Sequence, residues 1–179
     1  RIIHRWLRVP YALNVRYYHK PKKPRATVLF IHGIGNSGDA WREVIARVPS
    51  DVRVITIDLL GFGHSPRPSW AVYDVKTQAN AVLATYLKLR ITTPIIVVGH
   101  SLGSLVAIEI AKRYPLLVDS LILCSPPLYD FAETPTILPK TDTLLRELYR
   151  TAQQRSDDFV RLSAFAMKYK LINKSFNVT

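Results

Sequence analysis

The sequence predicts an α/β fold in which a mostly parallel sheet carries helices on both faces, and three observations point to it. The chain has 179 residues, of which 48% are hydrophobic and 21% charged, as expected of one globular domain or most of one. Short apolar runs rich in valine and isoleucine predict buried strands at 27–32, 52–58, 94–99 and 118–124. Helical patterns separate these runs, and such alternation requires crossovers and therefore parallel strand pairing.

The elements are expected in the following order. Residues 11–19 alternate apolar and polar side chains, which predicts an antiparallel edge strand. Helices are expected at 39–48, at 75–90 behind an N-cap at Asp74, and at 102–114, where Pro115 ends the pattern. The first three helices and the strands they join therefore make up the core of the fold.

The character of the chain changes after Pro126 and Pro127, where strand signals stop. Helical spacing of apolar residues predicts two amphipathic helices, at 140–153 and 156–171. We expect two parts: an N-terminal portion of the α/β core, residues 1–131, and the start of a helical cap, residues 132–179.

The net charge of +12 is concentrated at the start of the chain. Residues 1–38 carry eight lysines and arginines and no acidic residue. We interpret this arm as a solvated edge hairpin guarded by lysines, with at most weak contact with an anionic membrane surface and no nucleic-acid partner. No run of 18 apolar residues predicts a membrane span.

The single cysteine and the two chain ends indicate the cellular compartment and whether the chain is whole. The single Cys124 cannot form an internal disulfide, and no Cys/His cluster has metal-ligand spacing, so we expect no metal, no cofactor and a reducing, cytoplasmic location. Cys124 itself reads as a small buried hydrophobe. The chain starts at Arg1 without a methionine and stops in a polar stretch, so we expect it to be cut at both ends.

The chemistry is expected at Gly99-His100-Ser101-Leu102-Gly103. This Gly-x-Ser-x-Gly pattern falls between a predicted strand and a predicted helix, the context in which it forms a nucleophile elbow. A turn this sharp exposes the serine hydroxyl, and only small residues fit at Gly99 and Gly103 where neighbouring elements approach. The sequence therefore predicts Ser101 as a nucleophile.

A second loop is expected to complete this site. An acyl-transfer site needs two backbone N–H donors about 3 Å from the developing oxyanion. The amide of Leu102 is one candidate, and Ile34, which lies between Gly33 and Gly35 after the first buried strand, is the other. His100 adjoins the nucleophile, but its side chain is expected to point away from the serine hydroxyl, so it is not expected to be the base. Gly33 and His100 are instead expected to line the pocket.

Three motifs in order carry a family resemblance: His32-Gly33, then 58–65 with the letters DLLGFGHS, then the elbow at 99–103. Together they resemble the lidded branch of the α/β-hydrolase superfamily over residues 11–131. The resemblance implies that Asp58 is structural, and that the triad acid and histidine follow the cap, beyond Thr179. It thereby implies a truncated enzyme. Some relatives place the acid after the fourth strand, but Asp130 lies too far from it.

The function expected from these residues is hydrolysis of an ester or similar small acyl substrate through an acyl-enzyme on Ser101. The same site would also serve acyl transfer or cleavage of a C–C bond beside a carbonyl. A non-catalytic ligand-binding protein of this fold is the remaining alternative. The sequence leaves the oligomeric state, the acyl-chain length and the choice among these alternatives open.

Overall fold

The computed structural model describes His4 and residues 9–127. The described chain forms a five-stranded sheet in the order β1-β3-β2-β4-β5. The strands are β1 (Val15–His19), β2 (Ala26–Ile31), β3 (Val52–Ile57), β4 (Ile95–His100) and β5 (Val118–Cys124). Pairing is parallel between β2, β3, β4 and β5, and β1 pairs antiparallel with β3. The predicted mostly parallel sheet with an antiparallel edge strand is confirmed.

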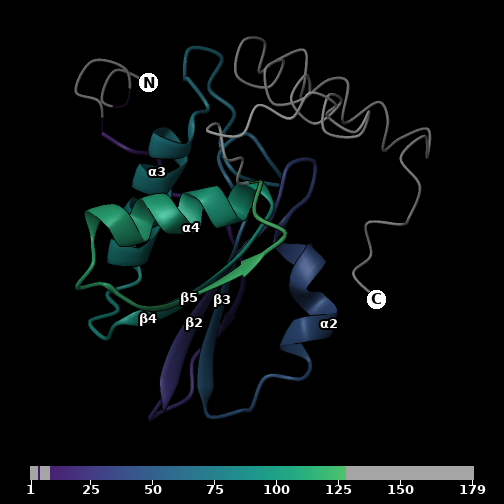
Figure 1. The fold of residues 1–179 in the computed structure, drawn as a ribbon, viewed down its shortest axis with the longest axis vertical. Helices are drawn as coiled ribbons and strands as arrows, with labels where there is room; N and C mark the ends of the chain where they lie inside the picture. The colour runs from purple at the N-terminus through teal and green to yellow at the C-terminus, as the bar shows by residue number, and fades with distance from the viewer. Residues whose placement is uncertain (1–3, 5–8, 128–179) are drawn as a thin grey trace, which may run out of the picture. The chain divides into compact units, whose positions relative to one another are not determined.

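Helices cover both faces of this sheet (Figure 1). One face carries α3 (Val75–Lys88) and α4 (Leu102–Arg113). The other carries the 3₁₀ turn η1 (Gly38–Trp41) and α2 (Arg42–Ile45). The buried apolar cluster on this second face consists of Phe30, Trp41, Val52, Val54 and Val98. Strand residues next to these in sequence, such as Ile31 and Ile55, are buried on the opposite face.

Two expectations about the elements are wrong. The helix expected at 39–48 is shorter, because Arg47 and Val48 donate to carbonyl groups three residues back and Pro49 cannot extend the ladder. The N-terminal arm is not a hairpin, because β1 pairs with β3 and not with β2. Strand β2 already lies between β3 and β4, so the free edge for β1 is that of β3.

The edge strand also starts later than expected, at Val15. Side chains bind the backbone before it: the amide of Leu13 donates to Thr85 Oγ1 at 2.7 Å, and that of Asn14 donates to Ser65 Oγ at 2.8 Å. The predicted N-cap of α3 is confirmed, since an Asp74 carboxylate oxygen accepts from the Thr77 amide at 2.7 Å.

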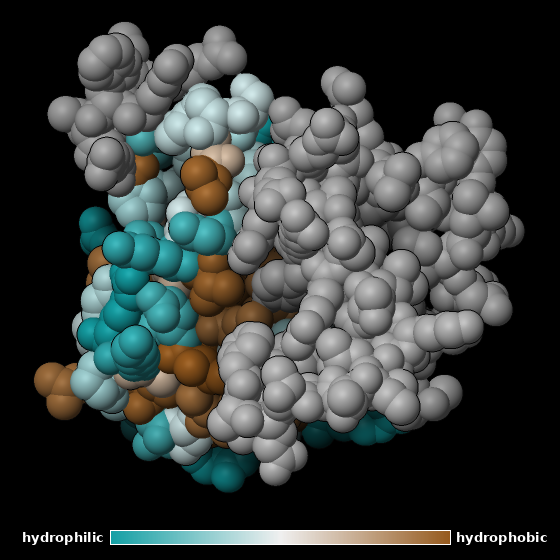
Figure 2. Space-filling view, turned by 45° about the horizontal axis from the view of Figure 1, so that its top comes forward, coloured by the Kyte–Doolittle hydropathy of each residue, from teal (hydrophilic) through white to brown (hydrophobic). Residues whose placement is uncertain are grey.

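The described surface mixes apolar and polar side chains, and brown and teal areas alternate on the face in Figure 2. The most exposed large apolar residues are Leu116, Val72 and Leu87. Among the described residues no helix is both long and apolar enough to cross a bilayer. The predicted helices at 140–153 and 156–171, Asp130 and the expected cap lie outside the described residues.

Candidate active site

Ser101 occupies the sharp turn between β4 and α4. Its φ of 53° and ψ of −117° lie in a region that non-glycine residues rarely adopt, and the helix begins at the next residue. The Ser101 amide donates to the Cys124 carbonyl at 3.0 Å, so the end of β5 holds the turn in place. The serine therefore lies at the carboxyl end of β4 in the geometry expected of a nucleophile elbow.

The close approach of α4 to the sheet explains the two glycines of the elbow. A Cβ atom on Gly103 would lie 2.2 Å from the Ile31 carbonyl oxygen, and one on Gly99 would lie 2.4 Å from that of Gly103. Both neighbours are backbone atoms and cannot move aside. Ser104, which is fully buried, adds a hydrogen bond of 2.7 Å from its hydroxyl to the Gly99 carbonyl. The helix is thus fixed against the strand that presents Ser101.

The loop after β2 meets this turn. A Cβ atom on Gly33 would lie 3.1 Å from Ser101 Cβ and 3.0 Å from His100 Nδ1. The structure thus brings Gly33, Ser101 and His100 together from two strands. Ile34 follows in a half-buried turn, with Gly35 at a φ of 73°. Leu102 begins α4, so its amide is among the N–H groups that a helix leaves without an internal acceptor.

His100 is half-buried at the end of β4, beside Gly33. Burial lowers the pKa of its imidazole below the ordinary value, which favours the neutral ring. No hydrogen bond joins its ring to Ser101 within the described part of the chain. His100 therefore lies beside Gly33 and next to the nucleophile in sequence, and its part in a substrate pocket stays a prediction.

Both ring nitrogens of His32 form hydrogen bonds with backbone groups. Its Nδ1 lies 2.7 Å from the Gly33 carbonyl oxygen, and the Leu59 amide donates to Nε2 at 2.9 Å, which fixes the neutral tautomer with a proton on Nδ1. Burial lowers the pKa of His32, although the bond to Gly33 opposes this effect. The ring ties the Gly33 loop to the end of β3 and cannot act as a base for Ser101.

Asp58 is the second buried anchor of this end of the sheet. Its carboxylate accepts from the amide of Gly38 at 2.8 Å, from that of His64 at 2.9 Å and from Asn14 Nδ2 at 3.0 Å. Burial alone would raise the pKa of Asp58, but these three donors outweigh it and the pKa lies below the ordinary value. With its oxygens occupied in this way, Asp58 organises loops, in agreement with its expected structural role.

The structure also reveals anchoring residues that the sequence did not single out. Gln78 is fully buried, donates from Nε2 to the Leu60 carbonyl and accepts from the Leu60 amide, at 2.8 and 2.9 Å. The sequence signal for Gln78 is its place as a polar residue on the apolar face of the predicted helix at 75–90. Among the described residues no group of three or more histidine, cysteine, aspartate or glutamate side chains could hold a metal ion.

Comparisons with known proteins agree with this geometry. A family model described as "alpha/beta hydrolase fold" matches residues 26–170. The chain is 34% identical over 110 residues to a protein named probable lysophospholipase BODYGUARD 4 from Arabidopsis thaliana, a match that covers 60% of this chain and 26% of that one. The chain thus spans about a quarter of the length of this curated relative.

Two solved structures are similar as well. A probable hydrolytic enzyme from Pseudomonas aeruginosa PAO1 is 27% identical with a TM-score of 0.60, over 86% of this chain and 60% of that chain. A membrane phospholipase A, described as a bacterial virulence factor, is 32% identical with a TM-score of 0.56, over 72% of this chain and 39% of that chain. The range matched by the family model, residues 26–170, includes β2 to β5 and the turn that carries Ser101.

Proposed function

Because the chain belongs to the alpha/beta hydrolase fold family, we propose that it carries the nucleophile of a serine hydrolase acting on a carboxylic ester or similar acyl substrate. The observation that carries the proposal is the backbone of Ser101, with a φ of 53° in a turn from strand to helix. Strain of this kind costs about 1–3 kcal/mol, persists only where the surrounding structure enforces it, and clusters at functional sites.

The reaction follows from the position of Ser101. Its Oγ attacks the carbonyl carbon of the ester while a base takes the hydroxyl proton, and the alcohol leaves as the acyl-enzyme forms. Water then attacks the acyl-enzyme, releases the acid and restores the serine. The amides of Leu102 and Ile34 hold the oxyanion in this proposal, helped by the N-terminal dipole of α4.

The base and its orienting acid are proposed to come from outside the described residues. Of the described histidines, His32 has both ring nitrogens bonded, and His19 Nε2 bonds the Ser50 carbonyl at 2.8 Å. His64 lies 3.3 Å from an Arg16 guanidinium nitrogen. The family resemblance implies an acid and a histidine that follow the nucleophile along the chain.

The names of relatives support an acyl ester as the substrate class. One relative is named a probable lysophospholipase and one solved structure a membrane phospholipase A. Both names denote enzymes that cleave ester bonds of lipids. We therefore favour the ester of a lipid-like acyl chain over a C–C bond as the bond that is cleaved.

Labelling with a fluorophosphonate probe tests this proposal on the intact protein. The probe is expected to attach once, and Ser101→Ala is expected to abolish the labelling. Ser120→Ala, which changes an exposed serine on β5, should label like the wild type. Failure of the folded wild type to react, or labelling that persists in Ser101→Ala, would contradict a nucleophilic Ser101 and favour a binding protein.

A further inference from the structure

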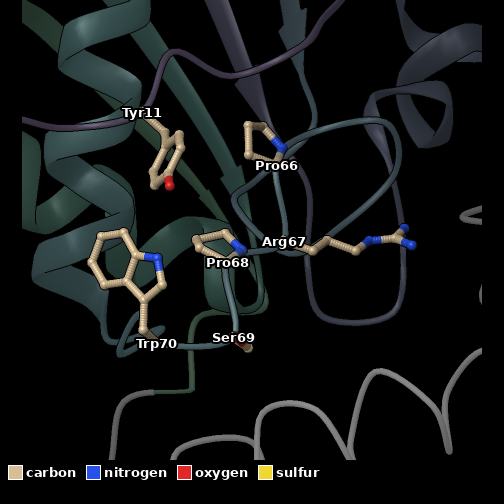
Figure 3. A pocket seen from close by; sticks show the side chains of 6 residues that line it. All are labelled: Tyr11, Pro66, Arg67, Pro68, Ser69 and Trp70. Atoms are coloured by element: carbon tan, nitrogen blue, oxygen red, sulfur yellow. The ribbon is translucent and has the colours of Figure 1, made fainter. Parts of the chain in front are cut away.

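The loop that follows β3 forms a pocket with the chain before β1. The pocket has a volume of about 290 Å³ and is lined by Tyr11, Pro66, Arg67, Pro68, Ser69 and Trp70 (Figure 3). None of these residues belongs to the proposed catalytic set. Two aromatic rings and two proline rings make its walls, so most of the lining is rigid.

Several contacts hold the pocket in shape. The rings of Tyr11 and Trp70 lie 6.0 Å apart, and the His4 ring stacks on Tyr11 at 3.7 Å. The Tyr73 hydroxyl donates to the Pro68 carbonyl at 2.9 Å. Arg67 points away from the two aromatic rings in Figure 3 and donates to the Gly63 carbonyl at 2.7 Å. The loop is therefore preformed.

Apolar side chains and cations flank the aromatic pair. Val9 lies two residues before Tyr11 and is 43% exposed, and Val72 lies two residues after Trp70 and is 63% exposed. Arg67 and Lys76 are exposed, and neither forms an ion pair with a carboxylate among the described residues. The nearby Asp74 is occupied as the N-cap of α3. We call Val9, Tyr11, Arg67, Trp70 and Val72 the Tyr11–Trp70 surface.

This surface lies toward the same edge of the sheet as the nucleophile. The loop of residues 58–74 leaves the carboxyl end of β3, and Ser101 follows the carboxyl end of β4. Both strands run parallel to β2, which lies between them, so their carboxyl ends share one edge. A surface that held this edge would bring Ser101 close to whatever it bound.

We propose that the Tyr11–Trp70 surface binds the protein weakly to an anionic lipid bilayer, with the Ser101 edge of the sheet turned toward the lipid. Tryptophan and tyrosine favour the membrane–water interface, exposed valines gain from burial there, and cations are attracted to anionic headgroups. A second copy of the chain is the less suitable occupant, because it would bring the same positive charge to the contact. Only the orientation toward a lipid ester rests on the proposed function.

Vesicle sedimentation with Ser101→Ala tests the binding apart from turnover. We expect binding to vesicles of phosphatidylcholine with phosphatidylserine, weaker binding to phosphatidylcholine alone, and a decrease as salt screens the charges. Val72→Asp is expected to weaken binding about tenfold, since it removes an exposed valine that would be buried in the bilayer and adds a negative charge. Trp70→Ala should have a similar effect.

Matched control variants test whether the membrane contact is at the Tyr11–Trp70 surface. Val44→Asp changes a valine on α2 that is 38% exposed, and Lys22→Gln with Lys23→Gln removes two charges from the loop between β1 and β2. Val44→Asp should bind vesicles like Ser101→Ala alone, and the double lysine variant should lose less vesicle binding than Val72→Asp does. Equal losses in Val72→Asp and Val44→Asp, or salt-independent binding, would overturn the proposal.

A fluorescence measurement keeps the proposal testable if Trp70→Ala does not fold. In Trp6→Phe, the remaining indoles are Trp41, which is buried, and Trp70. Brominated lipids in anionic vesicles should quench the fluorescence of this variant. If the fluorescence is not quenched at saturating lipid, or if the protein self-associates and does not bind vesicles, the proposal is overturned.

Discussion

Ser101 is held in its strained backbone conformation by neighbours that leave no room for adjustment. The Cys124 carbonyl accepts from its amide, and the two elbow glycines allow α4 to approach the sheet backbone. Because these contacts come from three separate strands, the conformation depends on the folded sheet and not on the local sequence alone. A single added methyl group at the elbow should therefore disturb both stability and the site.

Gly103→Ala is the direct test of this packing. The new methyl carbon would lie 2.2 Å from the Ile31 carbonyl oxygen, so α4 must move away from the sheet. We expect a loss of about 3 kcal/mol or more in the free energy of unfolding, measured by urea denaturation. Gly35→Ala is the control: it has open space but a φ of 73°, so its cost should be about 1–2 kcal/mol. Equal costs would contradict the close approach.

His32 makes the stability of the protein depend on pH. Its pKa in the folded state lies below the ordinary value of 6.5, chiefly because of burial, so the unfolded chain takes up a proton at a higher pH than the folded chain. This contribution to stability is present above pH 6.5 and is lost as the pH falls toward the folded pKa. Urea denaturation from pH 7.5 to 5 should show decreasing stability.

His32→Gln is expected to flatten this pH dependence. The variant should be less stable at pH 7.5, because the two backbone bonds of the imidazole are not reproduced, but its stability should fall less between pH 6.5 and 5. Some decrease should remain, since burial lowers the pKa of His100 as well. A variant with the full wild-type slope would show that the pH dependence comes from other groups.

At the scale of elements, apolar runs and N-cap chemistry predicted most of the described secondary structure. The predicted strand at 118–124 is identical to β5, and α3 begins at Val75 as predicted. Periodicity failed at 39–48, because turn hydrogen bonds and Pro49 limit the helix there. It also could not identify the bonds of Gln78 and Thr85, since a helical pattern shows which face is buried but not which loop will meet it.

The N-cap of α3 can be tested by itself. Asp74→Ala removes the acceptor for the Thr77 amide and should lower the free energy of unfolding by about 1 kcal/mol. Asp74→Asn keeps a side-chain oxygen that can accept this bond, so it should retain most of the stability. Thermal or urea denaturation of the two variants measures the difference. Equal losses in both would assign the effect to the charge and not to the cap.

At the scale of the whole molecule, the sheet brings together residues that lie far apart in sequence. Gly33 and Ser101 follow β2 and β4, which pair in parallel, so the two motifs meet at one edge. The motif order predicted the α/β-hydrolase superfamily, which the family match confirms. The oxyanion roles of Ile34 and Leu102 stay predictions.

The rest of the candidate site could not be predicted from the sequence for a physical reason. A triad is defined by geometry, and its members can lie anywhere along a chain. The pattern at 99–103 identifies a nucleophile because the turn itself demands those residue types. No such local constraint marks a base or an acid, and the Tyr11–Trp70 surface likewise arises from two segments that only the fold brings together.

Trapping of an acyl-enzyme tests the central proposal most directly. The intact protein is mixed with p-nitrophenyl acetate, quenched in acid within the first turnover and digested for mass spectrometry. We predict a burst of p-nitrophenol and an acetyl group on the peptide that contains Ser101, with both absent in Ser101→Ala. Turnover of the ester by the wild type without any acetylated Ser101 peptide, and at an equal rate in Ser101→Ala, would contradict it.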